Sequence, residues 1–380
     1  MPSNNPKVAF VYDRVNKFGG AERVLLSLHQ LFPEAPIYTL VHQPQSSLWA
    51  KDIQVIPTFL NHISYFRDRH ELLAPLAPLA FETLNFDIYD LVISITSESA
   101  KSIITKPHTL HLCYCLTPTR YLWSGRVEYR QNPNLGIISP LVKNILHKNI
   151  KYFQNRDLIL SHRPDYYFSI SKETQKRVKK YYHQDSDIVY PPIDYNFWSD
   201  PKSHSQKIKN SYLVVSRLVP YKKVDLVIKA FTKLRDKKLI VVGTGSQLPH
   251  LKSLATPNIQ FLGGITDLKL RSLYSQSQAV IFPQQEDFGL VPLEAQACGT
   301  PILAFNKGGA KETVIAGKTG LFFDQQTPDS IIGVINQFEH KNHQITANRC
   351  RTNAQKFSQA SFQKQFSVKV KILLKKHKPI

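Results

Sequence analysis

Residues 278–299 read QAVIFPQQEDFGLVPLEAQACG, and they contain one complete strand, turn and helix. The run QAVIFPQ is largely apolar, which predicts a strand buried on both faces of a sheet. The run LVPLEAQACG predicts the following helix, with Gly299 as its C-terminal cap. The loop QEDFG between them therefore lies at the carboxyl end of a parallel strand, where doubly wound sheets bind their ligands.

The same alternation of strand and helix occurs in two series along the chain. Predicted strands cover residues 7–13, 35–41, 53–59, 90–96, 110–115, 167–171 and 187–192, and then 211–217, 238–245, 259–264, 278–284, 301–306 and 320–323. Predicted helices cover residues 21–31, 172–182, 224–234, 268–275, 293–298 and 329–339. Apolar strands alternating with helices are typical of parallel sheets covered on both faces. The pattern predicts an α/β fold of two doubly wound, Rossmann-like domains facing a cleft.

Residues 191–207 interrupt the pattern with proline, aromatic and polar residues, and this segment is expected to hold the domain boundary. We therefore predict an N-terminal domain over residues 1–195 and a C-terminal domain over residues 196–360. Residues 361–380 predict one more helix. Its apolar face carries Phe362, Phe366, Val370 and either Leu373 or Leu374. That face is expected to pack across the domain seam; the alternative is attachment to an anionic membrane surface.

The 380-residue chain carries a formal net charge of +21, and most of the excess lies in the second half. Residues 101–180 and 341–380 are the most basic tracts. Such charge attracts nucleic acid, anionic lipid or phosphorylated substrates, and it does not by itself distinguish them. No apolar run of about 18 residues is present, and the N-terminus enters a strand without a signal-like segment, so we expect a cytoplasmic protein.

Two features could hold a metal ion. Cys113 and Cys115 alternate along a strand and share one face, but no second pair stands at zinc-finger spacing, so reduced core thiols are the favoured interpretation. Asp185 and Asp187 form an Asp-x-Asp pattern in a polar segment without supporting context. We predict no metal site.

Glu286 and Glu294 are the acidic residues of the opening stretch that suggest a sugar site. A carboxylate accepts two hydrogen bonds, so it suits vicinal hydroxyls of a ribose or a hexose. Backbone N–H groups near Gly289 and Leu290, at the helix start, are suited to binding phosphate. The ordinary alternative for each glutamate alone is a solvated charge at a helix end.

Residues 286–314, EDFGLVPLEAQACGTPILAFNKGGAKETV, resemble the nucleotide-sugar motif of the family 4 glycosyltransferases. Residues 18–28 (FGGAERVLLSL), 216–228 (SRLVPYKKVDLVI) and 241–251 (VVGTGSQLPHL) resemble further motifs of that family in the same order. Residues 89–123 and 189–198 resemble a branch associated with bacterial surface-polysaccharide assembly. The resemblance implies the two-domain GT-B fold, with residues 1–195 as the acceptor-side domain and residues 196–360 as the nucleotide-sugar-binding domain. It also implies transfer of a hexose, with retention of configuration, from a nucleotide-diphosphate sugar.

The resemblance also implies roles for individual residues. Arg217 and Lys222 match the basic pair on the donor diphosphate, where their charge would stabilise the leaving group without a divalent metal or other cofactor. Glu294 matches the residue that binds the nucleotide ribose, and Glu286 the one beside the transferred sugar. Other matched donor-binding positions are Asp287, Phe288, Gly289 and Leu290, and Gly19 and Gly20 in the N-terminal glycine loop. Lys223 stands where many relatives have glycine, so either lysine is a candidate for the phosphate.

The chain departs from the family pattern in residues 113–125, CYCLTPTRYLWSG. Leu116 replaces a histidine that relatives carry near the transferred sugar, and Ser124 replaces a common aspartate. Leucine cannot orient a hydroxyl. Either a neighbour such as His111 or Thr117 substitutes, or the acceptor is handled differently, or turnover is weak. Because His111 lies in a predicted strand, a packed histidine is the favoured interpretation of this residue.

The leading hypothesis is an enzyme that uses a nucleotide-sugar donor, with GDP-mannose favoured, and a glycan or lipid-linked acceptor. The basic tract 101–180 and the apolar residues 71–84 suggest a peripheral location on the inner face of the plasma membrane; the alternative for 71–84 is an ordinary core segment. A second hypothesis is a non-catalytic GT-B protein that binds nucleotide-sugar or glycan. A specific nucleic-acid binder is disfavoured, since no RNA-binding motif or helix-turn-helix is recognisable.

Overall fold

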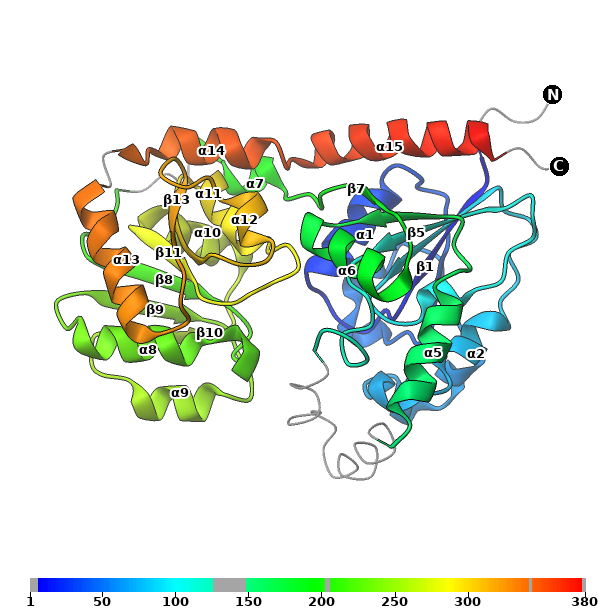
Figure 1. Ribbon diagram of the computed structural model, residues 1–380, viewed down its shortest axis with the longest axis horizontal. Helices are drawn as coiled ribbons and strands as arrows, with labels where there is room; N and C mark the ends of the chain where they lie inside the picture. The colour runs from blue at the N-terminus through cyan, green and yellow to red at the C-terminus, as the bar shows by residue number, and fades with distance from the viewer. Residues whose placement is uncertain (1–5, 126–147, 202–205, 342–343, 378–380) are drawn as a thin grey trace. The chain divides into compact units, whose positions relative to one another are not determined.

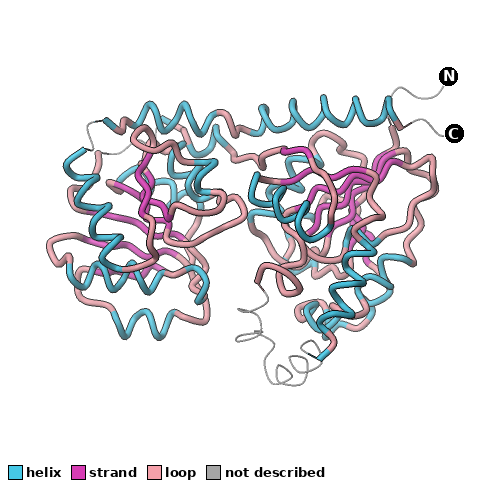
Figure 2. The backbone as a smooth tube through the Cα atoms, in the orientation of Figure 1, coloured by secondary structure: helices cyan, strands magenta, loops and turns pink. Residues whose placement is uncertain are grey.

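The computed structural model of the protein describes residues 6–125, 148–201, 206–341 and 344–377. The chain divides into two compact units: Met1–Pro191 together with Phe362–Ile380, and Pro192–Ser361. In each unit, strands are enclosed by helices (Figure 2). Parts of the basic tracts 101–180 and 341–380, of the boundary segment 191–207 and of the terminal helix predicted over 361–380 lie outside the described residues.

The first unit contains a parallel sheet in the order β3-β2-β1-β4-β5-β6-β7. Its strands are β1 Val8–Tyr12, β2 Ile37–Thr39, β3 Val55–Pro57, β4 Leu91–Thr96, β5 Leu110–Cys115, β6 Tyr166–Ser169 and β7 Asp187–Ile188. Its helices include α1 Gly20–His29, α2 Ala77–Glu82, α5 Ile150–Leu160 and α6 Lys172–Tyr182. The central strands β1, β4 and β5 are buried along their whole length, which explains their continuous apolar sequences.

The second unit contains a parallel sheet in the order β10-β9-β8-β11-β12-β13. Its strands are β8 Ser211–Val215, β9 Lys238–Val242, β10 Ile259–Gly263, β11 Ala279–Phe282, β12 Ile302–Phe305 and β13 Gly320–Phe323. Its helices are α7 Tyr195–Trp198, α8 Val224–Lys233, α9 Leu248–Leu254, α10 Asp267–Gln276, α11 Val291–Ala297, α12 Ala310–Thr313, α13 Pro328–Lys341 and α14 Ala347–Gln355. Helices α8, α9 and α13 pack on one face of this sheet, and α10 and α11 lie on the other (Figure 1). The predicted α/β, doubly wound architecture is confirmed for both units.

The C-terminal helix α15, Gln359–Lys376, carries the predicted apolar face. Phe362, Phe366, Val370 and Leu373 are buried, and Leu374 is only partly so. The Phe366 ring lies 5.5 Å from the Phe168 ring and 6.2 Å from the Tyr114 ring. This face therefore packs on β5 and β6 of the first unit, although the helix begins in the second unit.

Residues 71–84 form the end of an irregular helical segment and α2. One face of this stretch is buried in a core cluster of the first unit, and it carries Leu73, Ala77, Ala80 and Phe81. For that face, the alternative of an ordinary core segment is confirmed. Elsewhere on the stretch, Leu76 and Leu79 are about half exposed. Among the helices of the described residues, none has the length and apolarity needed to cross a bilayer.

Candidate functional site

The loop that follows β11 is held at the carboxyl edge of the second sheet. Strand β11 pairs with β8 on one side and with β12 on the other. The ends of these three parallel strands therefore bring residues 216–223, 283–290 and 306–309 to neighbouring positions. Gly289 allows the sharp turn into α11: its φ is +89°, and a Cβ there would lie 3.0 Å from the Phe282 ring.

Glu286 and Lys222 form an ion pair between two of these loops. Both side chains are largely shielded, with 12% of Lys222 and 23% of Glu286 exposed. The Gln284 amide nitrogen also donates to Glu286 Oε1, at 3.0 Å, and Gln284 is buried at the end of β11. The structure thus holds the Glu286 carboxylate with one cation and one amide, both of which are set by the ends of neighbouring strands.

Arg217 and Lys222 lie on the same segment after β8. Arg217 Nη2 donates to the Tyr221 hydroxyl at 2.6 Å, and the Lys222 ammonium lies 5.1 Å from the centre of the Tyr221 ring. The Arg217 side chain is exposed. Lys223 instead precedes α8 with a left-handed backbone, φ +55°. This conformation explains in physical terms why glycine suits that position, and it leaves Lys222 as the lysine that reaches Glu286.

Gly308 and Gly309 support the Glu286 loop from β12. The Gly309 N–H donates to the Glu286 carbonyl at 2.9 Å. A Cβ on Gly309 would lie 2.3 Å from Phe288 Cα, and one on Gly308 would lie 2.4 Å from the Glu286 carbonyl oxygen. Backbone can approach this closely only where side chains are absent. Our sequence reasoning did not select these glycines, although a Gly-Gly pair two residues after a strand was a usable signal.

Glu294 lies in α11 and is only 8% exposed. Its Oε2 accepts a hydrogen bond from the Tyr274 hydroxyl at 3.2 Å. Burial and the nearby Glu294 charge both raise the pKa of Tyr274 well above its usual value, so Tyr274 stays a neutral donor. Tyr274, on α10, is another site residue that sequence reasoning missed, because its partner is 20 positions away on another helix.

The three remaining turn residues differ in their surroundings. Phe288 is buried, with its ring 5.8 Å from that of Phe357, so its side chain belongs to the core. Asp287 is partly exposed in the turn. The Leu290 carbonyl accepts from the N–H groups of Leu293 and Glu294, each at 2.9 Å, and thereby starts α11.

Gly19 and Gly20 lie in the first unit, at the start of α1. Gly19 is the N-cap residue, and a Cβ there would lie 3.3 Å from a carboxylate oxygen of Glu22. Glu22 is buried and accepts a hydrogen bond from the Tyr12 hydroxyl at 2.6 Å. Sequence reasoning did not single out this buried carboxylate beside the glycine loop. Its position one turn into α1 was the available signal.

His111 does not replace the histidine absent at Leu116. It is buried near the start of β5, and its Nε2 lies 2.9 Å from Ser94 Oγ. Burial lowers its pKa to about 3, so it is a neutral, packed histidine. Leu116 is partly exposed directly after the same strand, and Thr117 is 5% exposed.

Asp185 and Asp187 each pair with a surface lysine, Lys179 and Lys369, at 2.7 and 2.8 Å. Cys113 and Cys115 are buried free thiols. Within the residues that the structure describes, no cluster of three or more histidine, cysteine or carboxylate side chains is arranged for a metal ion.

In the second unit, the arrangement combines two cations with two carboxylates at the carboxyl edge of one sheet. An ammonium has three donors, so Lys222 can bind Glu286 and a phosphate oxygen together. The carboxylates of Glu286 and Glu294 can accept hydrogen bonds from sugar hydroxyls. The site therefore has the chemistry to bind an anionic, hydroxyl-rich ligand.

Comparison with known proteins shows what this part of the chain resembles. Residues 197–357 match the family described as Glycosyl transferases group 1. The chain is 36% identical over 134 residues to a GDP-mannose-dependent alpha-(1-6)-phosphatidylinositol monomannoside mannosyltransferase of Mycolicibacterium smegmatis, covering 31% of this chain and 35% of that protein. It is 30% identical over 241 residues to an uncharacterized glycosyltransferase of Methanocaldococcus jannaschii, covering 58% of this chain and 61% of that protein. The chain thus spans less than two thirds of either relative's length.

Solved structures extend the similarity of fold to nearly the whole chain. The crystal structure of Anabaena HepE in complex with UDP-glucose has a TM-score of 0.70 at 18% identity, covering 97% of this chain and 100% of that one. We conclude that the chain has the two-domain GT-B fold, that its residues 197–357 match the Glycosyl transferases group 1 family, and that it resembles mannosyltransferases.

Proposed function

We propose that the protein is a retaining glycosyltransferase that moves a hexose, with mannose favoured, from a nucleotide-diphosphate sugar to a glycan or lipid-linked acceptor in surface-polysaccharide assembly. The Lys222–Glu286 pair, held by Gln284 at the end of β11, is the observation that carries the proposal. The similarity to a GDP-mannose-dependent mannosyltransferase supports GDP-mannose as donor and a lipid-linked acceptor.

In this proposal, Lys222 and Arg217 stabilise the negative charge that develops on the departing diphosphate. Cations that are already fixed in place need no reorganisation when charge appears, and this is why they lower the barrier; of the two, Lys222 is also largely shielded. Lys222 is held in place by Glu286, and Arg217 by Tyr221. Glu286 binds hydroxyls of the transferred sugar and Glu294 binds the ribose. Because the leaving-group charge is met by these side chains, the proposed reaction needs no divalent metal.

A donor screen by thermal unfolding tests the proposal. A ligand that binds only the native state raises its stability, by about 2.7 kcal/mol at 100 times Kd. We expect GDP and GDP-mannose to raise the Tm more than UDP and UDP-glucose. We also expect mannose transfer to membrane extracts to persist in EDTA. A larger Tm shift with UDP than with GDP would reject GDP-mannose as the donor. If EDTA abolished transfer and Mg²⁺ restored it, metal independence would be rejected.

Leu116 favours a second candidate function, namely a GT-B protein that binds nucleotide-sugar or glycan without turnover. The buried, neutral His111 cannot take the place of the missing histidine. Incubation of GDP-mannose with the purified protein separates the two candidates. A thermal shift without GDP release, in the presence or absence of membrane acceptors, would favour the binding protein over the enzyme.

We further propose that the first unit attaches to an anionic leaflet, which would bring the enzyme to a lipid-linked acceptor. Phe59, Ile63 and Tyr65 are about half exposed, as are Leu76 and Leu79. The Arg69 guanidinium lies 4.5 Å from the centre of the Tyr65 ring, which places a cation beside exposed aromatic surface. Apolar insertion combined with cationic attraction is what peripheral attachment requires.

Sedimentation with phosphatidylglycerol-containing vesicles tests this attachment. Ile63→Ser with Leu79→Ser is expected to reduce the bound fraction several-fold, because two inserting side chains are lost. Leu268→Ser serves as the control, since Leu268 is 63% exposed on α10 of the second unit. Equal binding by the double variant and the control would remove these residues from the proposed membrane surface.

A further inference from the structure

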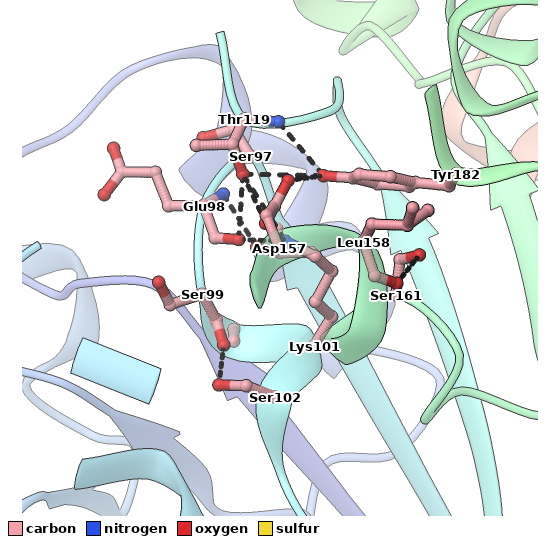
Figure 3. Close-up of polar contacts among 12 residues, drawn as sticks. Ser97, Glu98, Ser99, Lys101, Ser102, Thr119, Asp157, Leu158, Ser161 and Tyr182 are labelled. Atoms are coloured by element: carbon pink, nitrogen blue, oxygen red, sulfur yellow. Dashed lines mark hydrogen bonds and ion pairs between the residues drawn. The ribbon is translucent and has the colours of Figure 1, made fainter. Parts of the chain in front are cut away.

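Asp157 of α5 is a buried carboxylate on which four donors converge. Its Oδ1 accepts from Lys101 Nζ at 2.7 Å and from the Thr119 hydroxyl at 3.0 Å. Its Oδ2 accepts from Trp123 Nε1 at 2.7 Å and from the Tyr182 hydroxyl at 2.9 Å. The labelled members of this group point toward one another from separate parts of the first unit (Figure 3). Asp157 and its four donors belong to the first unit, whereas the Glu286 loop belongs to the second.

Three of the four donors come from the two loops that follow neighbouring strands β4 and β5, and the fourth, Tyr182, is the last residue of α6. Thr119 and Trp123 lie in residues 116–125, after β5, and this loop also carries Leu116. Thr119 is also held through its backbone, because its N–H donates to the Tyr182 hydroxyl at 3.1 Å. The Trp123 ring stacks on Tyr181 of α6, with 5.1 Å between ring centres. The loop is thus tied to α5 and α6 at several points.

Lys101 connects the same carboxylate to the loop after β4. Its ammonium donates to the Glu98 carbonyl at 2.5 Å as well as to Asp157. Burial alone would lower the pKa of Lys101, but the Asp157 charge raises it well above its usual value, so the ammonium remains charged. Asp13, at the end of β1, binds the N–H groups of Ser99 and Ala100, each at 2.9 Å. Both loops therefore have fixed positions at the carboxyl edge of the first sheet.

Stability alone does not account for a buried ion pair of this kind. Well-packed apolar residues of similar volume often give equal or greater stability than a buried pair, whereas removal of one partner leaves a costly buried charge. Hydrogen bonds have strict directions, however, and a carboxylate that accepts four of them places each donor at a defined angle. The arrangement is suited to setting the geometry of the two loops.

We infer that Asp157 is a positioning residue for the acceptor side of the reaction, because it joins residues 97–102 and 116–125 into one rigid edge of the first unit. This inference rests on the proposed function and on the expected acceptor-side role of the N-terminal domain. Asp157 acts through Thr119, Trp123 and Lys101 and does not itself touch the reacting atoms. The loop it holds begins at Leu116, the position where a residue near the transferred sugar is expected.

Tyr182→Phe tests the inference with little change of volume, and Tyr212→Phe is its matched control. Each tyrosine is buried and donates its hydroxyl to a carboxylate: Tyr182 to Asp157 at 2.9 Å, and Tyr212 to Glu339 at 2.8 Å in the second unit. Small misplacement of a reacting group can lower a rate about 100-fold. We expect Tyr182→Phe to lower kcat for transfer by about 10- to 100-fold while the donor KM changes less than twofold. Tyr212→Phe should leave kcat within twofold.

A second measurement follows the loop without relying on activity. The chain contains three tryptophans, which can all be replaced by 5-fluorotryptophan. In the fluorine NMR spectrum, Tyr182→Phe and Asp157→Asn should shift or broaden the Trp123 resonance. The resonances of Trp49 and Trp198 serve as internal controls, because their side chains contact neither Asp157 nor Tyr182 in any described interaction.

The outcomes separate this inference from the proposed function. Absence of transfer by the unaltered chain would reject the proposed function and the acceptor role with it. If the unaltered chain transfers the sugar and both Tyr182→Phe and Asp157→Asn have the same kcat as that chain, the positioning role alone is rejected. An unchanged Trp123 resonance in both variants would likewise reject it. A parallel rise in donor KM and fall in kcat would indicate a general structural role instead.

Discussion

Lys222→Ala is expected to lower kcat for sugar transfer by about 100- to 1,000-fold, which is the usual cost of removing one group that stabilises transition-state charge. Lys222 is 12% exposed and paired with Glu286, so its ammonium acts in a partly shielded setting. Glu286→Ala should abolish most activity as well, because the carboxylate proposed to hold the sugar is lost. Steady-state kinetics with GDP-mannose, together with circular dichroism to verify folding, would measure both effects.

The neighbouring lysine provides the control. Lys223 has a left-handed backbone, φ +55°, which costs a side-chain-bearing residue about 1–2 kcal/mol. Lys223→Gly should therefore keep kcat within a few-fold and raise the free energy of unfolding by about 1 kcal/mol. If loss of Lys223 lowered kcat as strongly as loss of Lys222, the assignment of Lys222 to the diphosphate would be wrong.

Gly309→Ala is expected to have the second largest effect, because the added methyl group collides with the loop that carries Glu286. The Cβ would lie 2.3 Å from Phe288 Cα, so the backbone itself must move. Overpacking of this kind costs about 1–3 kcal/mol. The displaced loop should also lose at least tenfold in donor affinity. Urea unfolding and isothermal titration with GDP-mannose would measure the two changes.

Gly333→Ala is the matched substitution. Gly333 lies within α13, and a Cβ there would meet nothing within 4 Å. The change should stabilise the protein by about 0.5–1 kcal/mol, since glycine is unfavourable inside a helix. Donor affinity should remain unchanged. Donor binding by Gly309→Ala at the unaltered Kd would show that the loop tolerates the methyl group, contrary to our prediction.

Local sequence patterns were enough to predict the architecture. All thirteen predicted strands correspond to strands β1 to β13, and each of the six predicted helices corresponds to a helix of the structure. Continuous apolar runs bounded by turn residues are a local property, and burial on both faces of a parallel sheet imposes it directly. The apolar face of α15 was predicted from another local property, the helical spacing of its apolar residues, with Leu373 rather than Leu374 as the last buried residue.

The candidate site was only partly accessible from sequence. Glu286, Glu294 and Gly289 could be selected because they lie on one strand–turn–helix step. Gln284 and Tyr274 could not be selected from sequence. An amide after a strand and a tyrosine in a helix are common, and their role depends on the carboxylates that they contact, Glu286 and Glu294. The strand position of His111 favours a packed histidine, and its burial beside Ser94 confirms this interpretation.

Strand and helix positions, and the residue types available at the loop after β11, follow from the order of amino acids along short segments. Which of those residues meet was decided by the sheet order β8, β11, β12, which brings Lys222, Glu286 and Gly309 together from distant parts of the chain. In the first unit the same applies to Asp157 and its donors. Side-chain periodicity is set by neighbours in sequence, whereas strand order is set by packing of the whole sheet. For this physical reason, the sequence determined the elements, and only the tertiary structure decided which of their residues meet.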